Sequence, residues 1–187
     1  MARIAATLVL LFALWSAASA EPFDALGFSA EFPAPAIVHP EQDGARDAQG
    51  HVLSKAVLVQ AGIAHVYSAV VVVETFQVPH RLDIDETLIA DRDSCLKGWN
   101  ATITASDPMV LDGHRALLFR YLGPGGRGGG AGIVAVVEAD APRIYVLFTM
   151  ATPKADRKLV EALERMVGSF HITLIRIEQP PGLSPGR

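Results

Sequence analysis

The residues of this chain best suited to metal or proton chemistry are its histidines, which stand far apart in the sequence. They are His39, His51, His65, His80, His114 and His171. No two of them form an H-x-H or H-E-x-x-H pattern, whereas a catalytic zinc ion needs three protein ligands and one open position. The spacing therefore predicts surface or structural histidines, with no metal site and no cofactor. Convergence of His39, His51 and His65 in space stays open.

Nucleophiles are equally isolated. The chain lacks the G-x-S-x-G pattern of a nucleophile elbow, and Ser169 stands at a predicted helix end. Cys95 is the single cysteine and falls near the apolar stripe of a predicted helix, where a small buried hydrophobe is the usual role. We therefore predict no catalytic residue, and the pattern favours a non-enzymatic protein over an enzyme.

A glycine-rich stretch over residues 123–132 formally contains G-x-G-x-x-G. A dinucleotide site needs that loop to lead from a strand into a helix, whose N-terminus meets the pyrophosphate. Here the following residues, 133–137, are Ile-Val-Ala-Val-Val, which is typical of a strand. We therefore predict a flexible hairpin loop, in which Arg127 could contact an anionic partner.

A second arginine, Arg120, stands among apolar neighbours. Because a buried arginine is costly unless it is paired, Arg120 either pairs with an acid inside the protein or reaches a surface groove. The internal pair is the favoured expectation. If the protein binds a small molecule or a metal instead, we expect a pocket at the sheet edge near His51, His65 or Tyr67.

The first 20 residues have the form of a secretory signal peptide. Arg3 supplies the positive start, the run 4–15 is apolar, and Ala18-Ser19-Ala20 fits the small-x-small rule for cleavage after Ala20. No cysteine follows for lipid attachment, and no other stretch is long and apolar enough to span a bilayer. We therefore expect a periplasmic or secreted protein with no membrane span after cleavage.

Cleavage of 20 residues from 187 leaves 167, enough for one domain, which we place at 21–177. The last ten residues, 178–187, are rich in proline and glycine and predict a disordered tail. Loss of Arg3 leaves 15 basic and 20 acidic residues, so the mature chain offers no electrostatic footprint for nucleic acid.

Alternating and β-branched apolar residues predict most of the strands. The first is 27–33, with Phe28, Ala30 and Phe32 on one face. Two long strands, joined at Gly62 and Ile63, follow; the second contains four successive valines, which favours burial on both faces by helices on each side of the sheet. The other predicted boundaries are 51–61, 64–76, 101–105, 114–122, 133–139, 143–150 and 171–177. Hairpin turns such as Asp112-Gly113 indicate largely antiparallel pairing.

Two helices complete the pattern. Asp83-x-x-Glu86 resembles a capping box at the start of the first helix, and Gly98 suits its end. Thr152 is the expected N-cap of the second helix, with Pro153 in its first turn. The apolar face expected to enter the core comprises Leu159, Leu163, Met166, Val167 and Phe170. The fold class is therefore α+β, a mainly antiparallel sheet flanked by two helices.

The order of these elements, with Phe28 to Pro33, Asp112 to Ala116, Arg143 to Leu147 and Ser169-Phe170, resembles the PsbP/Mog1-type α/β/α sandwich over about residues 25–177. That resemblance implies a role in binding or assembly and brings no shared catalytic signature. The leading hypothesis is a non-enzymatic exported binding or accessory module that contacts an envelope protein. The alternatives are a periplasmic small-molecule or metal-binding protein and a hydrolase with an unrecognised site.

Overall fold

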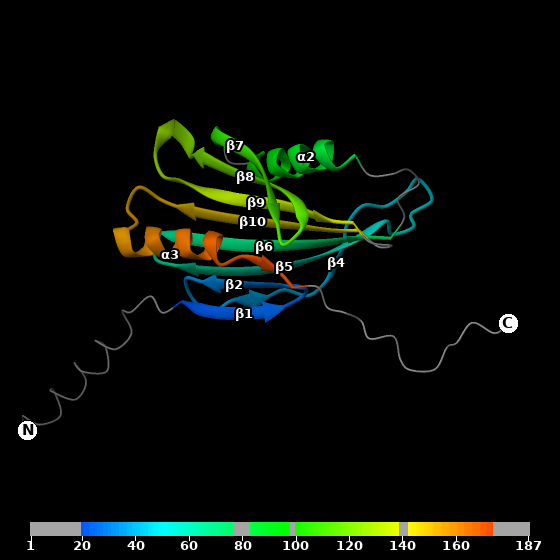
Figure 1. Cartoon of the computed structure of the whole chain (residues 1–187), viewed down its shortest axis with the longest axis horizontal. Coiled ribbons are helices and arrows are strands. Elements are labelled where there is room, and N and C mark those ends of the chain that lie inside the picture. The colour runs from blue at the N-terminus through cyan, green and yellow to red at the C-terminus, as the bar shows by residue number, and fades with distance from the viewer. Residues whose placement is uncertain (1–19, 77–82, 98–99, 139–141, 174–187) are drawn as a thin grey trace, which may run out of the picture.

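A computed structural model describes residues 20–76, 83–97, 100–138 and 142–173, which build an antiparallel sheet of eight strands beside a smaller sheet of three (Figure 1). The strand order in the large sheet is β3-β5-β6-β10-β9-β8-β7, with β4 also paired to β5. These strands are β3 (Ile37–Val38), β4 (Gln42–Asp43), β5 (Ser54–Ile63), β6 (Val66–Thr75), β7 (Thr102–Leu111), β8 (His114–Leu122), β9 (Gly129–Val137) and β10 (Arg143–Ala151).

One face of the large sheet is covered by the small sheet and by helix α3 (Arg157–Gly168). The small sheet has the order β1-β2-β11, formed by Glu21–Ala25, Phe28–Phe32 and His171–Ile172. Phe28 and Phe32 are fully buried there with Met166 and Phe170. The predicted face of β2 and the apolar face of α3 are thus confirmed. Pairing of β2 with β11 joins the two ends of the domain.

The other face carries helix α2 (Ile84–Leu96), which packs on β8, β9 and β10. Ile84, Leu88 and Leu96 are its buried residues, and Asp83 caps its start by accepting a hydrogen bond from the Glu86 backbone N–H. With helices on opposite faces of one antiparallel sheet, the predicted α+β class with an α/β/α arrangement is confirmed (Figure 1).

The turns show where local chemistry was enough and where it was not. Asp112 and Gly113 join β7 to β8 with φ of 49° and 84°, the two positive values that a tight hairpin turn needs. The turn between β5 and β6 was wrongly predicted at Gly62 and Ile63. Strand pairing continues to Ile63, and Ala64 takes the positive φ of 47° instead of a glycine.

Three predicted boundaries are also wrong. The first strand was predicted at 27–33, with only a short lead-in over residues 21–26, but residues 21–25 form β1, because they pair along their whole length with β2 and Phe23 stacks on Phe28 at 4.9 Å. Strand β7 extends to residue 111 rather than 105, since it pairs with β8 as far as the hairpin turn. Much of the glycine-rich stretch lies in strand β9 rather than in a flexible loop, so only residues 123–128 connect β8 to β9.

The N-cap of α3 is Asp156 and not Thr152. The Asp156 side chain accepts a hydrogen bond of 2.9 Å from the Leu159 backbone N–H. The Thr152 hydroxyl lies before the helix and accepts from the Lys154 backbone N–H at 3.4 Å, while the Thr152 N–H donates to the carbonyl of His65 in the β5–β6 turn. Residues 152–155 therefore form a turn between β10 and the helix.

Several expectations fall outside the described residues. They concern the signal peptide up to residue 19, His80, the helix end at Gly98, residue 139 of the predicted strand 133–139, residues 174–177 of the predicted last strand and the tail 178–187.

The capping assignment gives a direct prediction. Asp156→Ala removes the acceptor for the Leu159 N–H and should lower the free energy of unfolding by about 1 kcal/mol. Thr152→Ala, which keeps the backbone bond to His65, is the matched control and should cost clearly less. Urea unfolding of both variants measures the difference; an equal or larger loss for Thr152→Ala would contradict the assignment.

Candidate functional site

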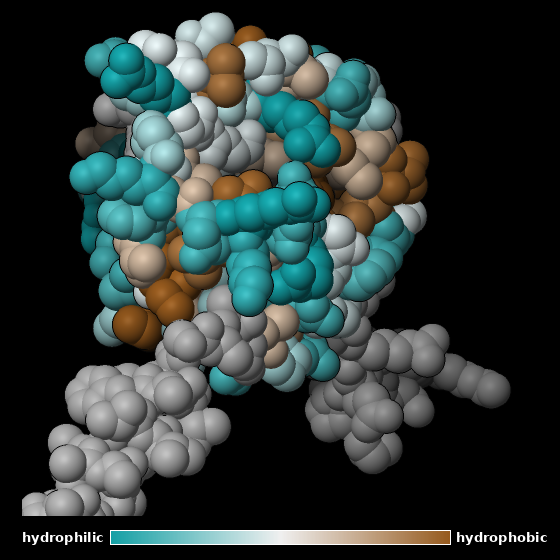
Figure 2. All heavy atoms as spheres, turned by 90° about the vertical axis from the view of Figure 1, so that its left-hand side faces the viewer, coloured by the Kyte–Doolittle hydropathy of each residue, from teal (hydrophilic) through white to brown (hydrophobic). Residues whose placement is uncertain are grey.

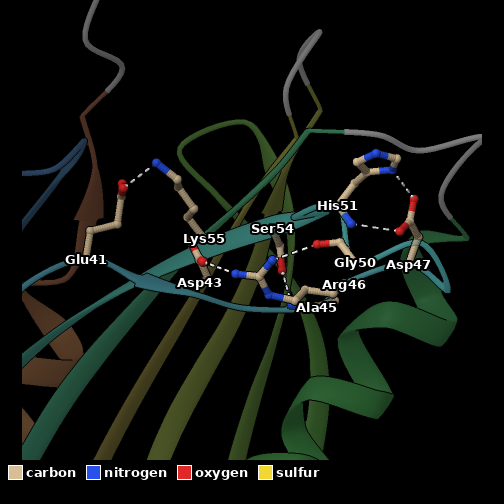
Figure 3. Close-up of polar contacts among 9 residues, drawn as sticks. All are labelled: Glu41, Asp43, Ala45, Arg46, Asp47, Gly50, His51, Ser54 and Lys55. Carbon is tan, nitrogen blue, oxygen red and sulfur yellow. Dashed lines mark hydrogen bonds and ion pairs between the residues drawn. The ribbon is translucent and has the colours of Figure 1, made fainter.

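The predicted site residue His51 lies on an exposed polar loop before β5 (Figure 3). Its ring Nδ1 lies 2.8 Å from Asp47 Oδ2, and this hydrogen bond is the largest cause that lowers the pKa of Asp47. Ion pairs between Lys55 and Glu41 and between Arg46 and Asp43 brace the same segment. These contacts hold the loop together and attach it to β5, so they explain the position of the His51 side chain without a bound ligand.

His65 and Tyr67 do not join His51. His65 lies in the β5–β6 turn, at the far end of ten-residue strand β5, or roughly 33 Å along the strand. The Tyr67 hydroxyl donates to Gln60 Oε1 at 2.8 Å, and its ring packs on the α2 side of the sheet. The structure therefore does not bring the three residues of the expected edge pocket together.

A groove instead opens between α3 and the β8–β9 part of the large sheet. Its volume is about 640 Å³. It is lined by α3 residues between Val160 and Val167 and by strand residues next to the β8–β9 connection, and that connection lies at the left end of the fold in Figure 1. Figure 2 views the molecule from this end, where hydrophilic side chains surround several hydrophobic patches. We call this hollow the α3 groove; its lining residues are Thr104, Arg120, Tyr121, Leu122, Gly128, Gly129, Gly130, Ala131, Thr149, Ala151, Thr152, Val160, Leu163, Glu164 and Val167.

The groove exists because the part of β9 beneath it carries almost no side-chain volume. Gly129, Gly130 and Ala131 line the hollow, and the strand alternation points Gly129 and Ala131 to the α3 face, where they leave it unfilled. At Gly130 a Cβ atom would lie 1.8 Å from the carbonyl oxygen of Thr149, and at Gly132 it would lie 2.3 Å from the ring of Phe119. Neither position has room for a side chain, so glycine there keeps β9, β10 and the α2 core in place.

The β9–β10 ladder is altered at this point. The two strands pair continuously from Arg143 opposite Val137 to Phe148 opposite Gly132. The pairing is then interrupted and resumes at Ala151 opposite Gly129. Between them, the Thr149 hydroxyl donates to the Ala131 carbonyl at 2.8 Å and accepts from its N–H at 3.2 Å. A buried side chain thus replaces backbone partners, which satisfies polar groups that would otherwise be costly in the core.

Two predicted binding residues line neighbouring hollows here. Arg120 stands on the β8 wall of the α3 groove, and Arg127 lines an adjoining hollow of about 160 Å³. The two hollows share Tyr121, Gly129, Ala151 and Thr152. The favoured internal ion pair of Arg120 is wrong: its side chain is exposed and pairs with no acid among the described residues. The strand alternation points it to the α3 face, away from the core around Phe119 and Tyr121.

The helix wall adds apolar surface and one acid. Val160, Leu163 and Val167 face the groove from α3, and Glu164 stands on the same helix. Leu163 is buried against Val66 and Leu159, so the wall is fixed by the core behind it. The sequence identified these positions only as a helix, since nothing in their types distinguishes a groove wall from a core face.

Burial rather than catalysis explains the remaining reactive groups. Burial, with a smaller effect of Asp91, raises the pKa of the Cys95 thiol to about 12. Burial also raises the pKa of Tyr121, whose hydroxyl donates to the Thr149 carbonyl at 2.7 Å. Within the described ranges, no group of three His, Cys, Asp or Glu side chains is placed to hold a metal ion.

Comparison with known proteins finds a likeness in structure only. No protein-family model and no curated protein matches the sequence. The solution structure of the cyanobacterial PsbP protein, CyanoP, from Synechocystis sp. PCC 6803 is similar with a TM-score of 0.46 and 14% identity, over 84% of this chain and 95% of that one. Assignment to the PsbP/Mog1 class stays a prediction. None of the helices in the described residues is both long and apolar enough to cross a membrane.

The environment of Cys95 predicts its reactivity. Because the reactive species is the thiolate and the pKa is raised from 9.0 to about 12, disulfide exchange with DTNB at neutral pH should be at least about a hundredfold slower than in the unfolded chain. Labelling rates with and without guanidinium chloride measure the ratio. A native rate close to the unfolded rate would show that the thiol is not buried as described.

The glycines beneath the groove predict an unusually large cost for one methyl group. Gly130→Ala places a Cβ against the Thr149 carbonyl and should lower the free energy of unfolding by about 3 kcal/mol. Gly168→Ala at the end of α3 meets nothing within 4 Å and should instead be neutral or stabilise by about 0.5 kcal/mol. Denaturant unfolding compares the pair; similar values would contradict the close approach of β9 and β10.

Proposed function

We propose that this protein is a non-enzymatic, exported binding module that takes a ligand into the α3 groove. The observation that carries the proposal is the groove itself, an open hollow of about 640 Å³ with an apolar helix wall and polar groups converging from the sheet. Small-molecule sites have volumes of this order and the same mixture of apolar lining with a few polar groups.

The side chains around the groove favour binding over catalysis. Its titratable lining residues are Arg120, Tyr121 and Glu164. The Tyr121 hydroxyl already donates a hydrogen bond to the Thr149 carbonyl, and the Thr149 hydroxyl already donates one to the Ala131 carbonyl. Nucleophilic catalysis needs a nucleophile and a base within hydrogen-bond reach of each other, and these lining residues supply no such pair.

The export part of the proposal is supported by the position of β1. This strand begins at Glu21, the residue after the predicted cleavage site, and pairs with β2 from Glu21 opposite Phe32 to Ala25 opposite Phe28. Cleavage after Ala20 would therefore leave every strand of the domain intact. The periplasmic or secreted location is part of this proposal, because it rests on the predicted signal peptide; the fold itself does not indicate a location.

A second candidate, contact with an envelope protein, is favoured by the outer strand of the sheet. Strand β7 lies at the end of the strand order, and its only strand partner in the described part of the chain is β8. Val110 and Ile103 on this strand are 70% and 37% exposed. An open strand edge with apolar side chains offers pairing and contact to another chain, although Pro108 removes one backbone donor.

One experiment separates the two candidates. A thermal-shift screen over a metabolite library and an organic extract of cell envelopes should raise the melting temperature, since a ligand bound only by the native state stabilises it by about 2.7 kcal/mol at a hundredfold excess over Kd. Val160→Phe, which fills the groove, should abolish the rise, whereas Val110→Phe on β7 should keep it.

The opposite pattern identifies the other function. If no fraction stabilises the protein and a stoichiometric envelope protein is retained by the wild type but lost by Val110→Arg, the edge of β7 is the binding surface and the groove proposal fails. Turnover of an ester or peptide substrate, lost in a groove variant, would overturn the non-enzymatic assignment.

A further inference from the structure

We infer that the ligand of the α3 groove is a single-chain amphiphile with an anionic head group, its chain on the helix wall and its head at Arg120. This inference rests on the proposed function, because it names the ligand class for the same groove. It follows from two properties of the hollow: the arrangement of its apolar surface and the balance of its charges.

The apolar surface forms a continuous strip between helix and sheet. Val160, Leu163 and Val167 supply it from α3, and Leu122 supplies it from β8, where its side chain is 42% exposed. The intervening floor is Ala131 with the glycines of β9, which place little side-chain volume between the two walls. A flexible hydrocarbon chain fits such a strip, and each buried methylene contributes about 0.8 kcal/mol.

The positive charge of Arg120 is placed at the sheet side of the strip. Arg120 has no acid partner among the described residues, and Arg127 lines the adjoining hollow. Glu164 is the one acidic residue that lines either hollow, and it stands on the opposite wall, in α3. Two guanidinium groups against one carboxylate leave an excess positive charge, and a guanidinium binds carboxylate or phosphate through two parallel hydrogen bonds.

Hydroxyl groups act in the same direction as the Arg120 guanidinium. Those of Thr104 and Thr152 also line the groove and can donate to an anionic head. The groove is therefore complementary to an apolar chain with a negative head, which Arg120 can pair with, whereas a cationic head gains no such partner on the sheet wall.

Isothermal titration calorimetry tests the inference with four probes at concentrations below micelle formation: dodecanoate, dodecyl phosphate, dodecanol and dodecyltrimethylammonium. The expected result is binding of both anions with one site, about tenfold weaker binding of dodecanol and no detectable binding of the cation. The relative affinity of dodecanoate and dodecyl phosphate identifies whether a fatty acid or a phosphate-headed lipid is the better source of the head group.

Matched variants locate the two halves of the ligand. Arg120→Gln should weaken dodecanoate about tenfold and leave dodecanol unchanged, whereas Arg115→Gln, also on β8 but paired with Asp85 of α2, should change neither. Val160→Phe should weaken both probes, and Val110→Phe should weaken neither. Circular dichroism and the melting temperature confirm that each variant is folded.

The outcomes separate this inference from the proposed function. Equal binding of dodecanol and dodecanoate, both lost in Val160→Phe, would overturn the anionic head while leaving the groove as a binding site. Failure of every amphiphile, together with a library ligand that Val160→Phe abolishes, would overturn the inference alone. Failure of both sets of probes overturns the proposed function as well.

Discussion

The close approach of β9 to β10 at Gly130 and Gly132 is the constraint on which both faces of the sheet depend. On the α2 face, the missing side chains make room for the rings of Tyr121 and Phe119, and Tyr121 reaches the Thr149 carbonyl. On the α3 face, Gly129 and Ala131 leave the groove unfilled. A larger residue at either strand position would push β10 away and displace Thr149, whose hydroxyl replaces the missing backbone partners of Ala131.

Packing of the two faces is correspondingly unequal. The small sheet and α3 bury a continuous aromatic cluster, in which Phe28 lies 5.6 Å from Phe170 and 6.3 Å from Tyr145. Helix α2 covers β8 to β10 with three buried residues and holds Asp91 partly buried, where desolvation raises the pKa of that carboxyl. The groove wall that α3 provides is backed by buried core residues.

Local patterns were enough for most of the fold and for half of the candidate site. Alternating apolar residues identified β2 and β8, and the capping-box pattern of Asp83 and Glu86 identified the start of α2. The glycines of β9 were assigned to a loop because the reason for them lies on other strands, at Thr149 and Phe119. Arg120 and Arg127 were identified as binding candidates from the sequence. The α3 wall was not, because the residue types of Val160 and Glu164 do not show that these side chains face a groove rather than the core or the solvent.

The pairing of β2 with β11 has a consequence for how the chain reaches its final state. The Glu31 N–H donates to Ser169 Oγ across 138 positions of sequence, and Phe28 stands opposite Ile172. Contacts of such long range form slowly because the loop between them must close first. A chain synthesised from its N-terminus cannot complete this aromatic core until β11 is available to pair with β2, so the domain stays open until one of the last described strands has formed.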